Sequence, residues 1–152
     1  MAVINWGKPK IEIVKLEENG AIPSSPSWTQ LDTPVEGTTT LETTEGEKTE
    51  AIDEGGAVVD TRKKKNKYSL KFSLFEKKGK EKPIEDEDGV ITDEYAVRIT
   101  PEDPTTPGFM LKKCSVSFQY TFSAAEGGRW AYTFDALAPD EGKMLERYTA
   151  GE

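Results

Sequence analysis

The sequence predicts a mainly β protein: a β-sandwich or barrel with one short flanking helix and a long polar β-hairpin. Three observations lead to this expectation. Apolar residues recur mostly at every second position, which is the period of a half-buried strand. Clusters of glycine, asparagine and proline separate the alternating stretches. The length of 152 residues suits one core, so we expect a single domain over residues 1–152.

The clearest expected strand covers residues 114–122, where apolar side chains alternate with serine, glutamine and threonine. After the small, turn-rich residues 123–128, the alternation resumes with Trp130, Tyr132 and Phe134, so these stretches should form a hairpin. Aromatic pairs across the hairpin should fix its register. Further strands are expected at residues 11–16, 68–74 and 95–100.

Evidence for helices is limited to two segments. Residues 138–148 are the best candidate, with Asp140 as the capping residue and Gly142 as an unfavourable position. Residues 83–94 fit a short helix or a loop equally well. Residues 21–34 contain three prolines and predict a long connection, of a length that is uncommon in compact domains.

Composition argues against several functional classes. The net charge of −8 disfavours general affinity for nucleic acid, which requires clustered lysine or arginine. The chain has no histidine and one cysteine, Cys114, on the apolar side of an expected strand, so we expect no catalytic, cofactor or metal site. Acidic residues 85–88 with Gly89 attract cations weakly at best, because they lack the spacing of a calcium loop. No stretch approaches the ~18 apolar residues of a membrane span, and residues 1–6 do not resemble a signal peptide.

Charge is segregated into three successive blocks. Residues 32–60 carry nine acids and one base, residues 62–82 carry ten bases and two acids, and residues 85–103 carry eight acids and one base. Such runs are usually solvated surface. Blocks of alternating sign can also attract each other, either within one subunit or between neighbouring subunits.

The first acidic block also contains two threonine-rich stretches, 37–44 and 48–53, joined by the turn-like Glu45-Gly46-Glu47. We expect these stretches to pair as a polar hairpin. Only Leu41, Ala51 and Ile52 are apolar, and a lone two-stranded hairpin is marginal in water. Pairing with copies of itself would remove the exposed edges and create a ring with an acidic, hydroxyl-rich lumen.

The chain resembles the tail tube proteins of bacteriophages in the order and spacing of several segments. These are residues 38–47, 54–56, 68–75, 88–90, 95–103 and 130–139. The resemblance implies six copies per ring, rings stacked into a tube, contacts with other tail proteins, and double-stranded DNA passing through without specific binding. It also implies assembly in the bacterial cytoplasm and a final location in the virion tail.

The resemblance further implies roles for particular residues. With Leu41 and Ile52 facing inward, Thr40, Glu42, Thr44, Thr49, Ala51 and Asp53 would face the lumen, and Glu45, Glu47 and Glu50 belong to the same lumen-lining hairpin. Contacts between subunits or rings would use the basic and acidic blocks, specifically Arg62, Lys63, Lys64, Lys65, Lys77, Lys78, Glu85, Asp86, Glu87 and Asp88. Two alternatives remain open: a monomeric β-sandwich that decorates a virion or mediates adhesion, and the inner tube of a contractile injection apparatus.

Overall fold

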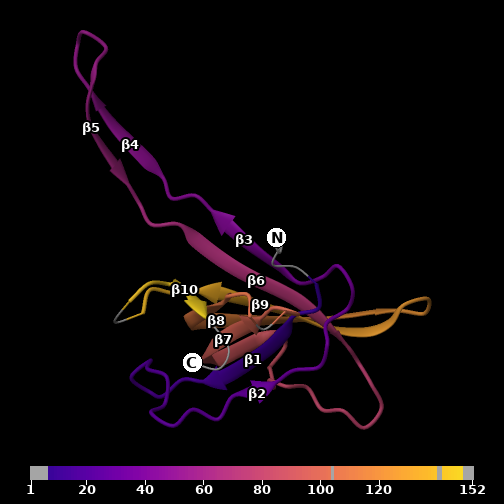
Figure 1. Cartoon of the computed structure of the whole chain (residues 1–152). Helices are drawn as coiled ribbons and strands as arrows, with labels where there is room; N and C mark the ends of the chain where they lie inside the picture. The colour runs from indigo at the N-terminus through magenta and orange to yellow at the C-terminus, as the bar shows by residue number, and fades with distance from the viewer. Residues whose placement is uncertain (1–6, 104, 140–141, 149–152) are drawn as a thin grey trace.

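The computed structural model describes residues 7–103, 105–139 and 142–148. These residues form β-strands and no helix (Figure 1). The strands are β1 (Lys10–Lys15), β2 (Thr29–Gln30), β3 (Thr40–Thr44), β4 (Lys48–Ile52), β5 (Val58–Lys63), β6 (Lys67–Phe75), β7 (Val90–Thr100), β8 (Gly108–Ser123), β9 (Gly127–Ala136) and β10 (Leu145–Tyr148). The mainly β expectation is confirmed.

The body of the protein is one antiparallel sheet with the order β2-β1-β7-β8-β9-β6-β3, and β10 pairs with the first part of β8. Because β2 and β3 end this order without pairing to each other, the sheet is open and the expected barrel is not formed. The predicted β8–β9 hairpin is confirmed. Its register places Phe118 opposite Tyr132 and Val116 opposite Phe134.

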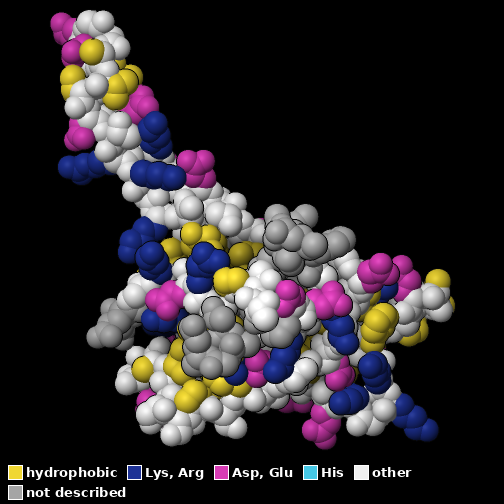
Figure 2. All heavy atoms as spheres, in the orientation of Figure 1, with side chains coloured by type: hydrophobic (Ala, Val, Ile, Leu, Met, Phe, Trp, Pro, Cys, Tyr) yellow, Lys and Arg dark blue, Asp and Glu magenta, His cyan; other side chains and the backbone are white. Residues whose placement is uncertain are grey.

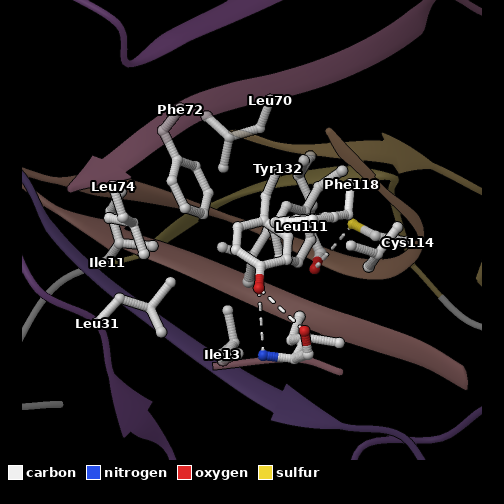
Figure 3. Close-up of a cluster of buried hydrophobic side chains, with 14 of the residues drawn as sticks. Ile11, Ile13, Leu31, Leu70, Phe72, Leu74, Leu111, Cys114, Phe118 and Tyr132 are labelled. Atoms are coloured by element: carbon white, nitrogen blue, oxygen red, sulfur yellow. Dashed lines mark hydrogen bonds between the residues drawn. The ribbon is translucent and has the colours of Figure 1, made fainter. Parts of the chain in front are cut away.

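The sheet curls around one core, which explains how a single open sheet buries apolar residues from strands far apart in its order. Leu70, Phe72 and Leu74 of β6 enter the core from one side, and Ile11 and Ile13 of β1 enter from the other (Figure 3). The aromatic rings of Phe72 and Phe134 stack with centroids 5.6 Å apart. The alternation seen in the sequence is thus an alternation between core and solvent.

The long connection at residues 21–34 covers the outer face of β1 and β7. Val14, Leu16 and Ala96 form a small second cluster there, and Trp28 and Ile22 from the connection pack against it. This second contact explains why β1 is buried on both faces. The connection therefore buries apolar side chains on the outer face of the sheet.

The expected helix at 138–148 is wrong for the residues that can be described. Residues 145–148 form β10, with Leu145 opposite Leu111, because the edge of β8 beyond β9 is free to accept a strand. Gly142 has a φ of +84°, which is incompatible with a right-handed helix. Asp140, the expected cap, lies outside the described residues.

Residues 83–89 also form no helix. A turn with Asp88 and Gly89 at positive φ, +50° and +88°, leads directly into β7. The loop interpretation of this segment is therefore confirmed up to Gly89, and residues 90–94 belong to the strand.

Candidate functional site

A long arm projects from the body and is the most distinctive feature of the molecule (Figure 1). We define the arm as residues 45–66, which contain β4 and β5. All of these residues are exposed except Gly46 and Asn66, which are half-buried. Strands β4 and β5 form a separate two-stranded sheet, so the arm has no face that packs on a core.

The predicted hairpin is present in a different form. The sequence suggested that 37–44 pairs with 48–53 around a turn at 45–47, and this pairing is wrong. Instead β3 pairs with β6, and β4 pairs with β5. The chain reverses at residues 53–57, where the amide of Ala57 donates to the carboxylate of Asp53 at 3.0 Å. The result is one long hairpin whose first branch is β3–β4 and whose second branch is β5–β6.

The segment 45–47 is the junction between the body and the arm. The amide of Gly46 donates to Oδ1 of Asn66 at 3.1 Å, and the amide of Lys64 donates to the carbonyl of Glu47 at 2.9 Å. A Cβ at position 46 would overlap the backbone carbonyl of Lys64. Glycine is thus required here by a close approach of two strands. From the sequence, this glycine was interpreted as the site where the chain reverses. The reversal is at Gly55-Gly56 instead, with Asp53 just before it.

The expected lumen residues do not share one surface. Thr40, Glu42 and Thr44 lie on the solvent face of β3, opposite the half-buried Leu41, as the parity of the strand predicted. On β4, however, Thr49 and Glu50 are consecutive and therefore point to opposite sides.

Ile52 was expected to face inward, but 59% of it is exposed, because β4 has no core beside it. Glu45 and Glu47 lie in the junction, and Asp53 lies in the turn at the tip of the arm.

Much of the charge segregation is explained by pairing across the long hairpin. Most of the acidic block lies on the first branch and the first part of the basic block lies on the second, so their side chains meet. Ion pairs join Glu42 to Lys71 at 3.3 Å, Glu45 to Lys63 at 3.2 Å and Glu47 to Lys64 at 3.4 Å. The long hairpin is therefore mixed in charge rather than purely acidic.

The third charge block is also partly satisfied within the chain. Asp86 accepts a hydrogen bond from Lys82 at 2.7 Å and another from the amide of Gly89 at 2.7 Å. The bond from Lys82 holds the pKa of Asp86 below its usual range. Its side chain is only 6% exposed, so Asp86 stabilises the turn before β7. Glu85 is paired to Lys82 at 3.8 Å, and Glu87 and Asp88 are exposed.

Several charged residues of the expected interfaces make no ion pair within the described ranges: Arg62, Lys65, Lys77, Lys78, Glu87 and Asp88. Arg62 and Lys65 belong to the arm, and Lys77 and Lys78 follow β6 on the far side of the body. The two pairs of basic residues therefore do not form one surface.

The charges of the arm are polarised along its length, which the sequence order did not reveal. The distal half, residues 49–61, contains four acids and no base, whereas the basal half, residues 45–48 and 62–66, contains five bases and two acids. Figure 2 shows acidic and apolar side chains near the tip and basic ones lower on the arm. Ile52, Val58 and Val59 supply the apolar surface of the tip and are 53–65% exposed.

A groove lies beside the base of the arm. Its volume is about 400 Å³, and the described residues that line it include Lys65, Tyr68, Met144 and Leu145. The groove thus combines basic side chains with apolar and aromatic ones. It was not predicted, because its two walls come from segments about 75 residues apart in the sequence.

Cys114 is buried, and burial raises the pKa of its thiol far above the usual range. In the part of the chain that the structure describes, no group of three acidic or sulfur-bearing side chains is arranged to hold a metal ion, and no helix could cross a membrane.

Neither a scan against protein-family models nor a search of curated proteins finds a match.

Proposed function

We propose that this protein is a structural subunit that assembles through its arm into rings and stacked tubes. The observation that carries the proposal is the arm itself: a two-stranded ribbon that stands free of the body with both faces exposed. Such a ribbon is marginal in water when alone. Association with other copies would bury it.

The edges of the ribbon suit this association. Within the described residues, the outer edges of β4 and β5 are unpaired, and so is the outer edge of β3. Unpaired edges are templates for strand addition. If β5 of one copy lies beside β4 of the next, the strands remain antiparallel, and repetition around an axis closes a barrel without edges.

The resemblance to bacteriophage tail tube proteins supports a more specific assignment. In a tail tube the lumen would conduct double-stranded DNA during its passage from the capsid. Pairs such as Glu42 with Lys71 occupy lysines that would otherwise attract phosphates, which is consistent with passage without tight binding.

The proposal is tested by light scattering coupled to size exclusion and by negative-stain electron microscopy of the purified protein. We expect rings and tubes. A matched variant replaces residues 49–62 by Asn-Gly, because Lys48 and Lys63 are opposite partners that a two-residue turn can join. This variant should keep the circular dichroism spectrum of the body and remain monomeric.

Two results would overturn the proposal. A wild-type protein that stays monomeric at high concentration would instead favour the decoration or adhesion module. Assembly of the shortened variant as efficient as that of wild type would show that the arm is not the interface.

A further inference from the structure

The two halves of the arm carry complementary unpaired charges. Asp53, Glu54 and Asp60 in the distal half make no ion pair with any described residue, and the same holds for Arg62 and Lys65 in the basal half. Other charges of the arm are already paired, such as Glu50 with Lys48 at 3.2 Å across the boundary of the two halves. The unpaired charges are therefore available to a partner.

Asp53 and Glu54 at the tip are kept apart from Lys65 in one chain, whereas Asp60 lies only two residues from Arg62 on β5. Lys64 is opposite Glu47, and the turn begins six residues later at Asp53. At about 3.3 Å per residue, the tip lies roughly 20 Å from the level of Lys64. An extended ribbon cannot fold back over that length, so the unpaired acids at the tip can reach basic residues at this level only on a second molecule.

Exposed apolar residues also gather at two places, the tip of the arm and the groove at its base. The tip exposes Ile52, Val58 and Val59 next to its acids. The groove at the base places Tyr68 and Leu145 next to Lys65. Apolar contacts supply affinity and complementary charges supply register, so the two surfaces match in both respects.

We propose that the acidic tip of one arm docks into the basal groove of the next copy along the direction of the arm. The proposal rests on the proposed assembly and names the contact by which one ring would be joined to the next. Tip and groove are different surfaces of the same chain, so the contact is heterologous and repeats without closing. Copies joined by this contact therefore stack in one direction.

Charge reversal tests this contact. The tip variant carries Glu54→Lys and Asp60→Lys, and it keeps Asp53 because that side chain holds the turn. The groove variant carries Lys65→Glu and Lys143→Glu, at two basic residues that line the groove. Either variant alone should reduce the stacked fraction about tenfold, because each pair is weak but recurs once per subunit. Combining all four substitutions in one chain should restore stacking.

A control variant, Glu17→Lys with Glu18→Lys, makes the same change of charge at exposed positions outside the arm and should stack like wild type. As a second measurement, Val59→Cys and Lys65→Cys proteins are mixed and oxidised. A disulfide between the two variants is expected, and the buried native thiol of Cys114 should not compete.

The outcomes separate this inference from the proposed function. Rings that stack normally in both charge-reversed variants, with no mixed disulfide, would overturn the docking of tip into groove and leave ring assembly intact. A wild-type protein without rings would overturn both. Loss of stacking in the single-surface variants, its recovery in the combined variant and a mixed disulfide would support the contact.

Discussion

Replacing Arg98 by alanine is expected to destabilise the body more than any other single change on its outer face. The guanidinium of Arg98 donates two parallel hydrogen bonds to Glu12, from Nε to Oε1 and from Nη2 to Oε2, both at 3.1 Å. It also lies 4.2 Å from the ring centroid of Trp28 and 4.9 Å from that of Tyr148. One side chain therefore connects β7 to β1, to the long connection and to β10.

The magnitude follows from the burial of this pair. The side chain of Glu12 is 10% exposed and that of Arg98 is 20% exposed, so water cannot fully replace the lost bonds. Removing Arg98 leaves the buried Glu12 carboxylate with only Lys10, at 3.8 Å, as an ion partner, which costs about 2.5 kcal/mol, and losing the contact with Trp28 adds roughly 0.5–1 kcal/mol. We therefore expect Arg98→Ala to lower the free energy of unfolding by about 3 kcal/mol. Arg98→Lys keeps the charge but loses the planar fork, so it should cost about half as much.

Equilibrium unfolding in urea, followed by tryptophan fluorescence, measures this change. Arg62→Ala is the matched control, because Arg62 is exposed on the arm and should change the free energy of unfolding by less than about 0.5 kcal/mol. A double-mutant cycle with Glu12→Gln should show a coupling above about 1 kcal/mol. Two results would refute this role of Arg98: a free energy of unfolding of Arg98→Ala within about 0.5 kcal/mol of wild type, or no coupling in the cycle.

Three further predictions concern the core, the junction and the thiol. Burial raises the pKa of Tyr132 to about 12, and its hydroxyl donates to the carbonyl of Ile84 at 2.9 Å. The fold therefore favours the neutral phenol. The stability that Tyr132 contributes is complete below pH ~10, the pKa of an unfolded tyrosine, and is lost as the pH rises to ~12. Tyr132→Phe should flatten that fall in a pH series of urea titrations, and an unchanged slope would contradict the assignment. Gly46→Ala should push apart the two chain segments that meet at Lys64. Amide hydrogen exchange in the arm should then become faster, while the core amides remain protected. Arm amides that exchange as slowly as in wild type would argue against the close approach. Cys114 should react with a thiol reagent only at the rate of unfolding, and rapid labelling of native protein would show that it is accessible.

The sequence alone determined where most strands of the body lie and, for β6 and the central part of β8, which side faces the core. Alternation is a local property, because neighbours two positions apart share a face whatever the strand pairs with. Residues 68–74, 95–100 and 114–122 were accordingly recognised as strands, and the apolar sides of residues 68–74 and 114–118 are buried as expected. Tyr120 and Phe122 are instead 50% and 70% exposed, and β7 is buried on both sides, at Ala96 and Thr100 as well as at Val97 and Ile99. The same local reasoning missed β10, since four residues without a clear pattern become a strand only when an edge of β8 accepts them.

Pairing, by contrast, was decided by the tertiary structure. Two turn signals lie in the polar segment, at Gly46 and at Gly55-Gly56, and composition gives no means to choose between them. The choice is made by β6, whose residues Leu70 and Phe72 must enter the core beside β9 and so draw β3 alongside. Once β3 is committed to β6, residues 45–66 have only each other to pair with, and the arm results.

The amounts of opposite charge are a property of the sequence, and the fold determines which of these charges meet. Three blocks of alternating sign are visible in the chain, and their partners are not, because an ion pair requires proximity in space. Folding brings the acidic and basic blocks together along the long hairpin and leaves unpaired acids at its tip and unpaired bases at its base. That uneven distribution is a property of the hairpin's register, which depends on contacts made in the core.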